Sequence, residues 1–301
     1  MTNIKGLKPF YVRINLFTSI SKSDEMQKIT DISELKEIAR KIRVDIIKMT
    51  HAAGSGHPGG SLSAAEIFAV LYFNIMNHKP ENPEWEDRDV FILSKGHCCP
   101  GLYSAMARSG YFPVEELMTL RKLGSRLQGH PHSCALPGLE ASTGSLGQGL
   151  SIAVGCALAI KLNKKNNRVY CLMGDGEQQE GQIWEAAMSA AHYKVDNLVG
   201  IVDRNCLQID GFTKDVMNYE PLEDKWKSFG WHVISVDGHD ISALIKAFEE
   251  AKTIKGKPTV IIADTTKGKG VSFMGNVAIW HGQAPNDEEM KKALNDLGEH
   301  H

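Results

Sequence analysis

An acidic residue stands between two glycines in the stretch MGDGEQQEG, which follows the apolar run VYCLM. Gly174 and Gly176 allow the backbone around Asp175 to turn tightly and to approach a ligand closely. A helix expected to begin near Glu180 would add free N–H groups and the positive end of its dipole, and both suit a phosphate. The pattern therefore predicts a site for a phosphate-bearing ligand.

Asn205 lies on the loop after the next apolar strand, LVGIVD. Strand pairing would bring its side-chain oxygen beside the Asp175 carboxylate, with the Leu207 carbonyl within reach. These three oxygens, completed by diphosphate oxygens and water, make a suitable octahedral site for Mg2+. Short motifs also match by chance, so an ordinary turn and an ordinary loop residue stay open for these residues alone. A dinucleotide fingerprint fits less well, because GxGxxG would need glycine at Gln179.

Five apolar segments rich in Val and Ile are predicted to be strands: residues 89–94, 169–173, 198–203, 231–237 and 259–264. Helical patterns separate most of them. Such an alternation indicates an α/β fold, with a mostly parallel sheet and helices on both faces. Ligands collect at the carboxyl ends of the strands in these sheets. The unusual residues at 94–97, 174–176, 203–205 and 264–267 all follow a strand.

Apolar residues at three- and four-residue steps predict a helix that begins at Ile32, with Asp31 or Ser33 as its cap. The glycines and Pro58 of HAAGSGHPGG must end this helix. Residues 61–76 are nearly apolar around the whole helical circumference, which predicts a buried helix. Residues 147–165 predict a second buried helix, whose small residues would permit close packing against a neighbour.

Composition limits the classes of partner. Lys and Arg number 34 and Asp and Glu number 36, a net charge of −2 without a long basic run, so we expect no nucleic-acid partner. No apolar run reaches the roughly 18 residues of a membrane span. Six cysteines without a CxxC spacing favour reduced thiols and a cytoplasmic protein. We expect a flexible extension over residues 1–29 and one domain over residues 30–301.

Eight stretches in order along residues 54–282 resemble transketolase. They are GSGHPGGSLSAAEI, LSKGHCCPGLY, GHPH, STGSLGQGLSIAVG, MGDGEQQEGQIWEA, DRNCLQIDG, GWHVISVDGHD and KGKG followed by WHG. GDG followed after 28 residues by Asn205 is similar to the thiamine diphosphate motif. The resemblance implies the diphosphate-binding domain of the thiamine diphosphate-binding fold, with thiamine diphosphate and Mg2+ as cofactors.

The resemblance also implies roles for individual residues. Asp175, Asn205 and the Leu207 carbonyl would hold the metal. The catalytic histidines, in proton transfer or in binding sugar hydroxyls, would be His57, His130 and His281. The cofactor would be bound by His97, Gly144, Leu146, Gly174, Asp175, Gly176, Glu180, Asn205 and His281. Glu180 and Glu185 would lie near a subunit interface.

Simpler interpretations stay open for several of these residues. A single histidine is more often a surface or core residue than a catalytic one. A zinc cluster is conceivable from HCC and HPHSC, but these ligands lack the usual CxxC spacing. Glu180 and Glu185 could be first-turn acids favoured by the helix dipole. Lys267 and Lys269 of KGKG are interpreted as loop residues, with a phosphate contact as the alternative.

Only twenty residues follow His281. In the family that the chain resembles, a glutamate on a second, pyrimidine-binding domain activates the cofactor, and this chain has no room for that domain. The resemblance therefore implies the N-terminal subunit of a split transketolase, which joins a separately encoded C-terminal subunit in an α2β2 assembly. This assembly would transfer a two-carbon ketol unit between sugar phosphates. An α subunit of a 2-oxo acid dehydrogenase and a non-catalytic regulatory subunit are the alternatives.

Overall fold

A computed structural model of the protein describes residues 28–299, so most of the extension predicted at residues 1–29 lies outside the described residues. The central sheet has five parallel strands in the order β1-β2-β3-β7-β6. They are β1 (Val90–Leu93), β2 (Val169–Gly174), β3 (Leu198–Arg204), β6 (His232–Asp237) and β7 (Thr259–Asp264). The predicted α/β fold with a parallel sheet is confirmed.

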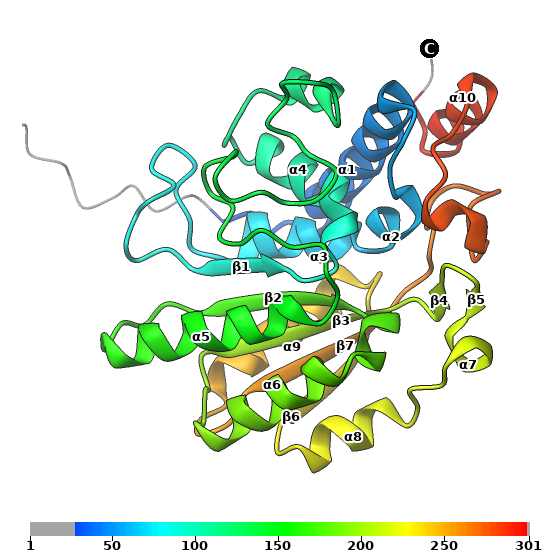
Figure 1. The fold of residues 1–301 in the computed structure, drawn as a ribbon. Helices are drawn as coiled ribbons and strands as arrows, with labels where there is room; N and C mark the ends of the chain where they lie inside the picture. Colours follow the sequence, from blue (N-terminus) through cyan, green and yellow to red (C-terminus); the bar gives the residue numbers. More distant parts are fainter. Residues whose placement is uncertain (1–27, 300–301) are drawn as a thin grey trace, which may run out of the picture.

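Helices cover both faces of this sheet (Figure 1). Strand side chains alternate between two cores: Tyr170 and Leu172 of β2 pack in one, and Cys171 and Met173 in the other. The first core is formed with α1 (Ile32–Ala53), α3 (Ala65–Val70), α4 (Cys99–Arg108) and α9 (Ile241–Thr253). The second is formed with α5 (Gln148–Leu162), α6 (Gly181–His192) and α8 (Leu222–Ser228).

The first helix begins and ends as predicted. The Asp31 side chain accepts hydrogen bonds from the first backbone N–H groups of α1, and Gly54 ends the helix with a φ of 59°. The predicted helix over residues 61–76 is in fact three pieces: α2 (Pro58–Ser63), α3 and a π-helical turn at Leu71–Ile75. Pro58 begins α2 because proline suits the first helical turn, where its missing N–H costs nothing.

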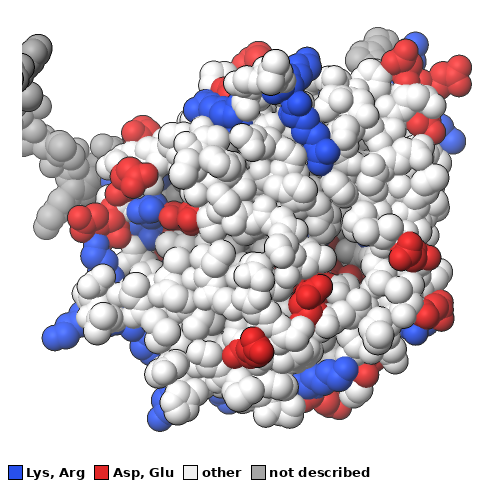
Figure 2. Space-filling view, viewed as in Figure 1, with Lys and Arg blue, Asp and Glu red and all other residues white. Residues whose placement is uncertain are grey.

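Helix α5 is less buried than its sequence predicts. Ile152 and Leu162 on its outer side are 36% and 83% exposed, and Met188 on the neighbouring α6 is 59% exposed. The predicted buried helix is therefore buried on one side only within this chain. Figure 2 shows few charged side chains over the middle of the face that α5 and α6 form.

The other elements are short. A hairpin of β4 (Leu207–Gln208) and β5 (Gly211–Phe212), which the sequence did not predict, leads into α7 (Thr213–Val216), and α10 (Asp287–Asp296) lies near the end of the chain. Further 3-10 turns lie at Gly96–Cys98, Val114–Thr119, Gly176–Gln179 and Ala278–His281. All six cysteines are free thiols. Between residues 28 and 299, no helix is long and apolar enough to cross a membrane.

Candidate active site

A cavity of about 350 Å3 opens where the carboxyl ends of the central strands meet. Its walls include all the residues that the sequence nominated for cofactor, metal and catalysis. These are His57, His97, His130, Gly144, Leu146, Gly174, Asp175, Gly176, Glu180, Asn205, Leu207 and His281. Glu185 is exposed on α6 and does not line the cavity.

Strand pairing brings the predicted metal ligands together. Gly174 of β2 is in register with Asp203 of β3, so the loops that carry Asp175 and Asn205 leave the sheet side by side. The Asp175 carboxylate accepts hydrogen bonds from the Gly176 N–H at 2.8 Å and from the Tyr219 hydroxyl at 3.1 Å. Asp175 is only 2% exposed. Burial, and then the charge of Asp203, raise the pKa of Asp175 to about 6.

These oxygen atoms suit a hard cation. Burial destabilises the negative charge of a carboxylate, and a positive neighbour stabilises that charge. The Leu207 carbonyl already accepts a hydrogen bond from a cation, the Lys267 ammonium, at 2.7 Å. Asn205 is buried, and its Oδ1 accepts only a weak 3.2 Å bond from the Leu207 N–H. The donor set of carboxylate, amide and carbonyl oxygens therefore fits Mg2+. Among residues 28–299, no three His, Cys, Asp or Glu side chains are grouped as metal ligands.

Glu177 holds the turn around Asp175 in place. Its buried carboxylate accepts hydrogen bonds from the Gly174 N–H at 2.9 Å, from the Gly147 N–H at 2.8 Å and from the Ser94 hydroxyl. Burial raises the pKa of Glu177. Sequence reasoning nominated Glu180 in the same stretch and missed Glu177. One signal for Glu177 was present in the sequence, its position directly after the stretch at residues 174–176. Two of its partners, Gly147 and Ser94, lie in distant segments that no local pattern connects to it.

A buried ion pair lies beneath the cavity. The Lys95 ammonium contacts the Asp203 carboxylate, and their side chains are 2% and 0% exposed. Lys95 also donates to the Gly60 carbonyl at 3.0 Å, and Asp203 accepts from the Ser63 hydroxyl at 2.6 Å. The pair thereby ties the loop after β1 to the end of β3 and to α2. It was not predicted, although Lys95 follows β1 and Asp203 lies at the end of β3.

Four histidines form a cluster in the wall of the cavity. The ring of His57 lies 5.2 Å from that of His97, 6.3 Å from that of His130 and 5.5 Å from that of His281, measured between centroids. Burial lowers the pKa of His57 to about 4 and that of His281 to about 3, and it also lowers the pKa of the other two. All four rings are therefore neutral near pH 7.

Lys267 is a buried part of this site, not a simple loop residue. It is 2% exposed, and burial lowers its pKa. Its ammonium lies 3.0 Å from Nδ1 of His281. An ammonium can only donate, so Nδ1 of His281 accepts and the proton of the neutral ring is on Nε2. Lys269 is exposed, as a loop residue would be.

The cavity can thus hold an anion and a cation together. Lys95, Lys267 and neutral imidazole rings line the cavity together with the residues that carry the Asp175, Asn205 and Leu207 oxygens. A metal-bound diphosphate needs both kinds of group. Residues 34–301 match the family described as transketolase, thiamine diphosphate binding domain.

The chain belongs to the transketolase family.

Relatives of similar length are named as parts of transketolases. The chain is 45% identical over 267 residues to the 6-deoxy-6-sulfo-D-fructose transketolase subunit SqwG of Clostridium sp. (strain MSTE9), covering 89% of this chain and 96% of that relative. It is 42% identical over 268 residues to one subunit of the apulose-4-phosphate transketolase of Phocaeicola vulgatus, covering 89% of this chain and 95% of that relative. The chain therefore corresponds to the N-terminal type of transketolase subunit.

Solved transketolases share the fold but are longer. The structure superposes on transketolase from Campylobacter jejuni with a TM-score of 0.84 and 37% identity, covering 89% of this chain and 43% of that chain. For transketolase from Leishmania mexicana the TM-score is 0.83 and the identity 34%, covering 88% of this chain and 41% of that chain. The chain thus spans about two-fifths of the length of these transketolases.

Proposed function

We propose that this chain is the cofactor-holding half of a two-subunit transketolase that moves a two-carbon ketol unit from a ketose to an aldose. The observation that carries the proposal is the single cavity that Asp175, Asn205 and Leu207 line together with His57 and His281. Transketolase membership supports thiamine diphosphate as the cofactor. When bound, this cofactor supplies the nucleophilic carbon that takes up the two-carbon unit.

In the proposed enzyme, the residues of this chain bind the metal and the cofactor and orient the sugar. Asp175, Asn205 and the Leu207 carbonyl hold Mg2+, and His97 and Lys267 contact the diphosphate. Gly144 and Leu146 shape the cofactor's side of the cavity. His57, His130 and His281 face the sugar, and because these rings are neutral at pH 7 they present N–H donors to its oxygens.

A separately encoded C-terminal subunit would complete the site with a pyrimidine-binding domain and its activating glutamate. The relatives of similar length support this division, as does the weakly charged face of α5 and α6, which exposes Ile152 and Met188. We propose an α2β2 assembly in the cytoplasm, where the six cysteines would stay reduced. The substrates are proposed to be sugars that end in an anionic group, since relatives are named for apulose 4-phosphate and for a sulfo-sugar.

The direct test is ketol transfer with thiamine diphosphate and Mg2+, comparing the chain alone, the partner alone and both together. The donors would be xylulose 5-phosphate, apulose 4-phosphate and 6-deoxy-6-sulfofructose, with an aldose phosphate as acceptor. Activity only in the mixture supports the proposal. No transfer from any donor by a complex that binds the cofactor would overturn it.

The metal assignment is tested by Asp175→Asn, which keeps the shape of the side chain and removes its charge. We expect Mg2+-dependent binding of thiamine diphosphate to the assembled protein, measured by calorimetry, to be lost. Asp210→Asn is the matched control, because Asp210 also lines the cavity but is exposed. Unchanged binding in Asp175→Asn would sink the metal assignment.

A further inference from the structure

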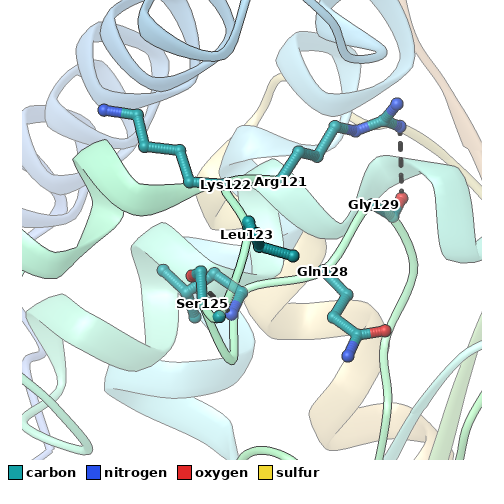
Figure 3. A pocket seen from close by; sticks show the side chains of 8 residues that line it. Arg121, Lys122, Leu123, Ser125, Gln128 and Gly129 are labelled. Atoms are coloured by element: carbon teal, nitrogen blue, oxygen red, sulfur yellow. Dashed lines mark hydrogen bonds between the residues drawn. The ribbon is translucent and has the colours of Figure 1, made fainter.

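Arg121 lies on the loop that joins the 3-10 turn at Val114–Thr119 to His130. Its backbone is held in the left-handed region, with a φ of 58°, and its N–H donates to the Leu127 carbonyl at 2.8 Å. Such a backbone is costly for a residue with a side chain and is often found at functional sites. Figure 3 shows the guanidinium extending to Gly129, while the side chain of Lys122 extends to the opposite side.

The guanidinium is shared among three partners. It donates to the Ser55 hydroxyl at 2.9 Å, to Nδ1 of His57 at 3.3 Å and to the Gly129 carbonyl at 3.4 Å. Gly129 permits this arrangement, because a Cβ there would lie 2.8 Å from Cζ and Nε of Arg121. The contact between Arg121 and His57 is therefore built into the loop, not a chance meeting of two surface side chains.

This contact decides where the His57 proton sits. A guanidinium only donates hydrogen bonds and keeps its proton at any ordinary pH. Nδ1 of His57 must therefore accept, and the single proton of the neutral ring must be on Nε2. That edge of the ring faces away from Arg121. Nε2 lies near Gly282, 3.8 Å from the place that a Cβ would take, and makes no hydrogen bond with the described residues.

We propose that Arg121 is a positioning residue, which holds His57 as the neutral Nε2–H tautomer and so makes Nε2, on a ring that lines the cavity, a hydrogen-bond donor to a substrate oxygen. The tautomer follows from the geometry alone, whereas its consequence for substrate rests on the proposed ketol transfer. The resemblance implied either proton transfer or the binding of sugar hydroxyls for His57. An Nε2 that already carries a proton cannot accept another, so at neutral pH the ring would bind a sugar oxygen.

The charges around His57 favour the same state. The groups that face the ring from the packed elements are basic or neutral: Arg121, His97, His130, Lys267 and His281. Burial first, and then the interactions with Arg121, His130 and Lys267, lower the pKa of His57 to about 4. Protonation at Nδ1 would both break the Arg121 contact and set two positive charges together.

Nuclear magnetic resonance of labelled histidine in the full chain tests the tautomer without any activity. We expect an unprotonated Nδ1 and a protonated Nε2 for His57 in the wild type. In Arg121→Met the pKa of His57 should rise by about one unit, the usual size of one nearby charge, and the ring should sample both tautomers. Gly129→Ala should also release the tautomer, because it displaces the guanidinium without removing its charge.

Arg126→Met is the matched control, since Arg126 is on the same loop but pairs with Glu116 at 2.6 Å. It should leave the His57 spectrum unchanged. Arg121→Lys keeps a charge without the planar fork, and should leave the His57 pKa lower than Arg121→Met does. A protonated Nδ1 in the wild type, or wild-type spectra in both Arg121→Met and Gly129→Ala, would overturn the proposal.

Kinetics of the assembled enzyme test the consequence for substrate. Arg121→Met should lower kcat/KM about tenfold, the size of one hydrogen bond, and should shift the acid limb of the pH profile upward. In a His57→Asn background the same substitution should have little further effect. An equal loss in both backgrounds would contradict a role through His57. If no ketol transfer is found at all, the spectroscopic result still decides the tautomer.

Discussion

At the scale of single residues, the ion pair of Lys95 and Asp203 shows how much the site depends on buried charge. Lys95→Met would leave the fully buried Asp203 carboxylate without its cation. We expect a loss of about 3–5 kcal/mol in the free energy of unfolding, measured by urea denaturation. Lys161→Met is the control: Lys161 pairs with Asp196 at 2.8 Å but is 38% exposed, so its loss should be below about 1 kcal/mol. Equal losses would contradict a structural role for the buried pair.

At the scale of elements, the start of helix α5 is fitted closely against the loop after β1. A Cβ on Gly149 would lie 2.5 Å from the Ser94 side chain, whereas a Cβ on Gly155 in the same helix would have no atom within 4 Å. Gly149→Ala should therefore lower the free energy of unfolding by roughly 1–3 kcal/mol through overpacking. Gly155→Ala should raise it by about 0.5–1 kcal/mol, because alanine favours the helix. Thermal unfolding measures both changes. If the two variants changed the free energy of unfolding in the same direction, the atoms around Gly149 would have moved to make room for the added methyl group.

At the scale of the whole molecule, the histidine cluster makes stability depend on pH. The folded pKa values of His57 and His281, about 4 and 3, lie below the unfolded value of 6.5. Between pH 6.5 and 4 the unfolded chain therefore binds protons that the folded protein does not, so the free energy of unfolding falls with decreasing pH. Asp175 has the opposite effect on the free energy of unfolding, because its pKa of about 6 in the folded protein is higher than its unfolded value of 3.8. His97 and His130 add to the loss of stability at low pH, because their pKa values are also lowered in the folded protein.

We expect the metal-free chain to be less stable at about pH 5 than at about pH 7. The double variant with His57→Asn and His281→Asn should lose less stability over this interval, because two of the groups that titrate differently are gone. Urea denaturation at both pH values measures the difference. A loss in the double variant as large as in the wild type would assign the pH dependence to other groups.

The exposed apolar side chains on the outer face of α5 and α6 lead to a prediction about assembly of the complex. Ile152→Asp should prevent complex formation with the C-terminal subunit or with a second copy of the chain, because a charge would enter an apolar interface. Circular dichroism should stay unchanged, since Ile152 is already 36% exposed. Glu249→Lys on α9, which covers the other side of the sheet, is the control. Light scattering after size exclusion measures the mass, and an intact complex in Ile152→Asp would place the interface elsewhere.

The sequence by itself determined the parts that depend on neighbours along the chain. Apolar runs define the strands, and the rule that parallel strands present ligand sites at their carboxyl ends predicts that Asp175, Asn205 and Leu207 lie at one edge of the sheet. The Asp31 cap and the end of α1 followed from local hydrogen bonding alone. The four histidines were nominated from short motifs by resemblance, and the structure groups them around one cavity.

Only the tertiary structure decided which side chains are buried against partners far away in sequence. Lys95 and Asp203 are 108 residues apart, Ser94 and Glu177 are 83 apart, and Arg121 reaches His57 across 64 residues. No local pattern encodes such contacts, because they arise from strand order and loop path. The exposed side of α5 has the same cause: its apolar composition favours burial, but the layers of this single chain leave that side uncovered.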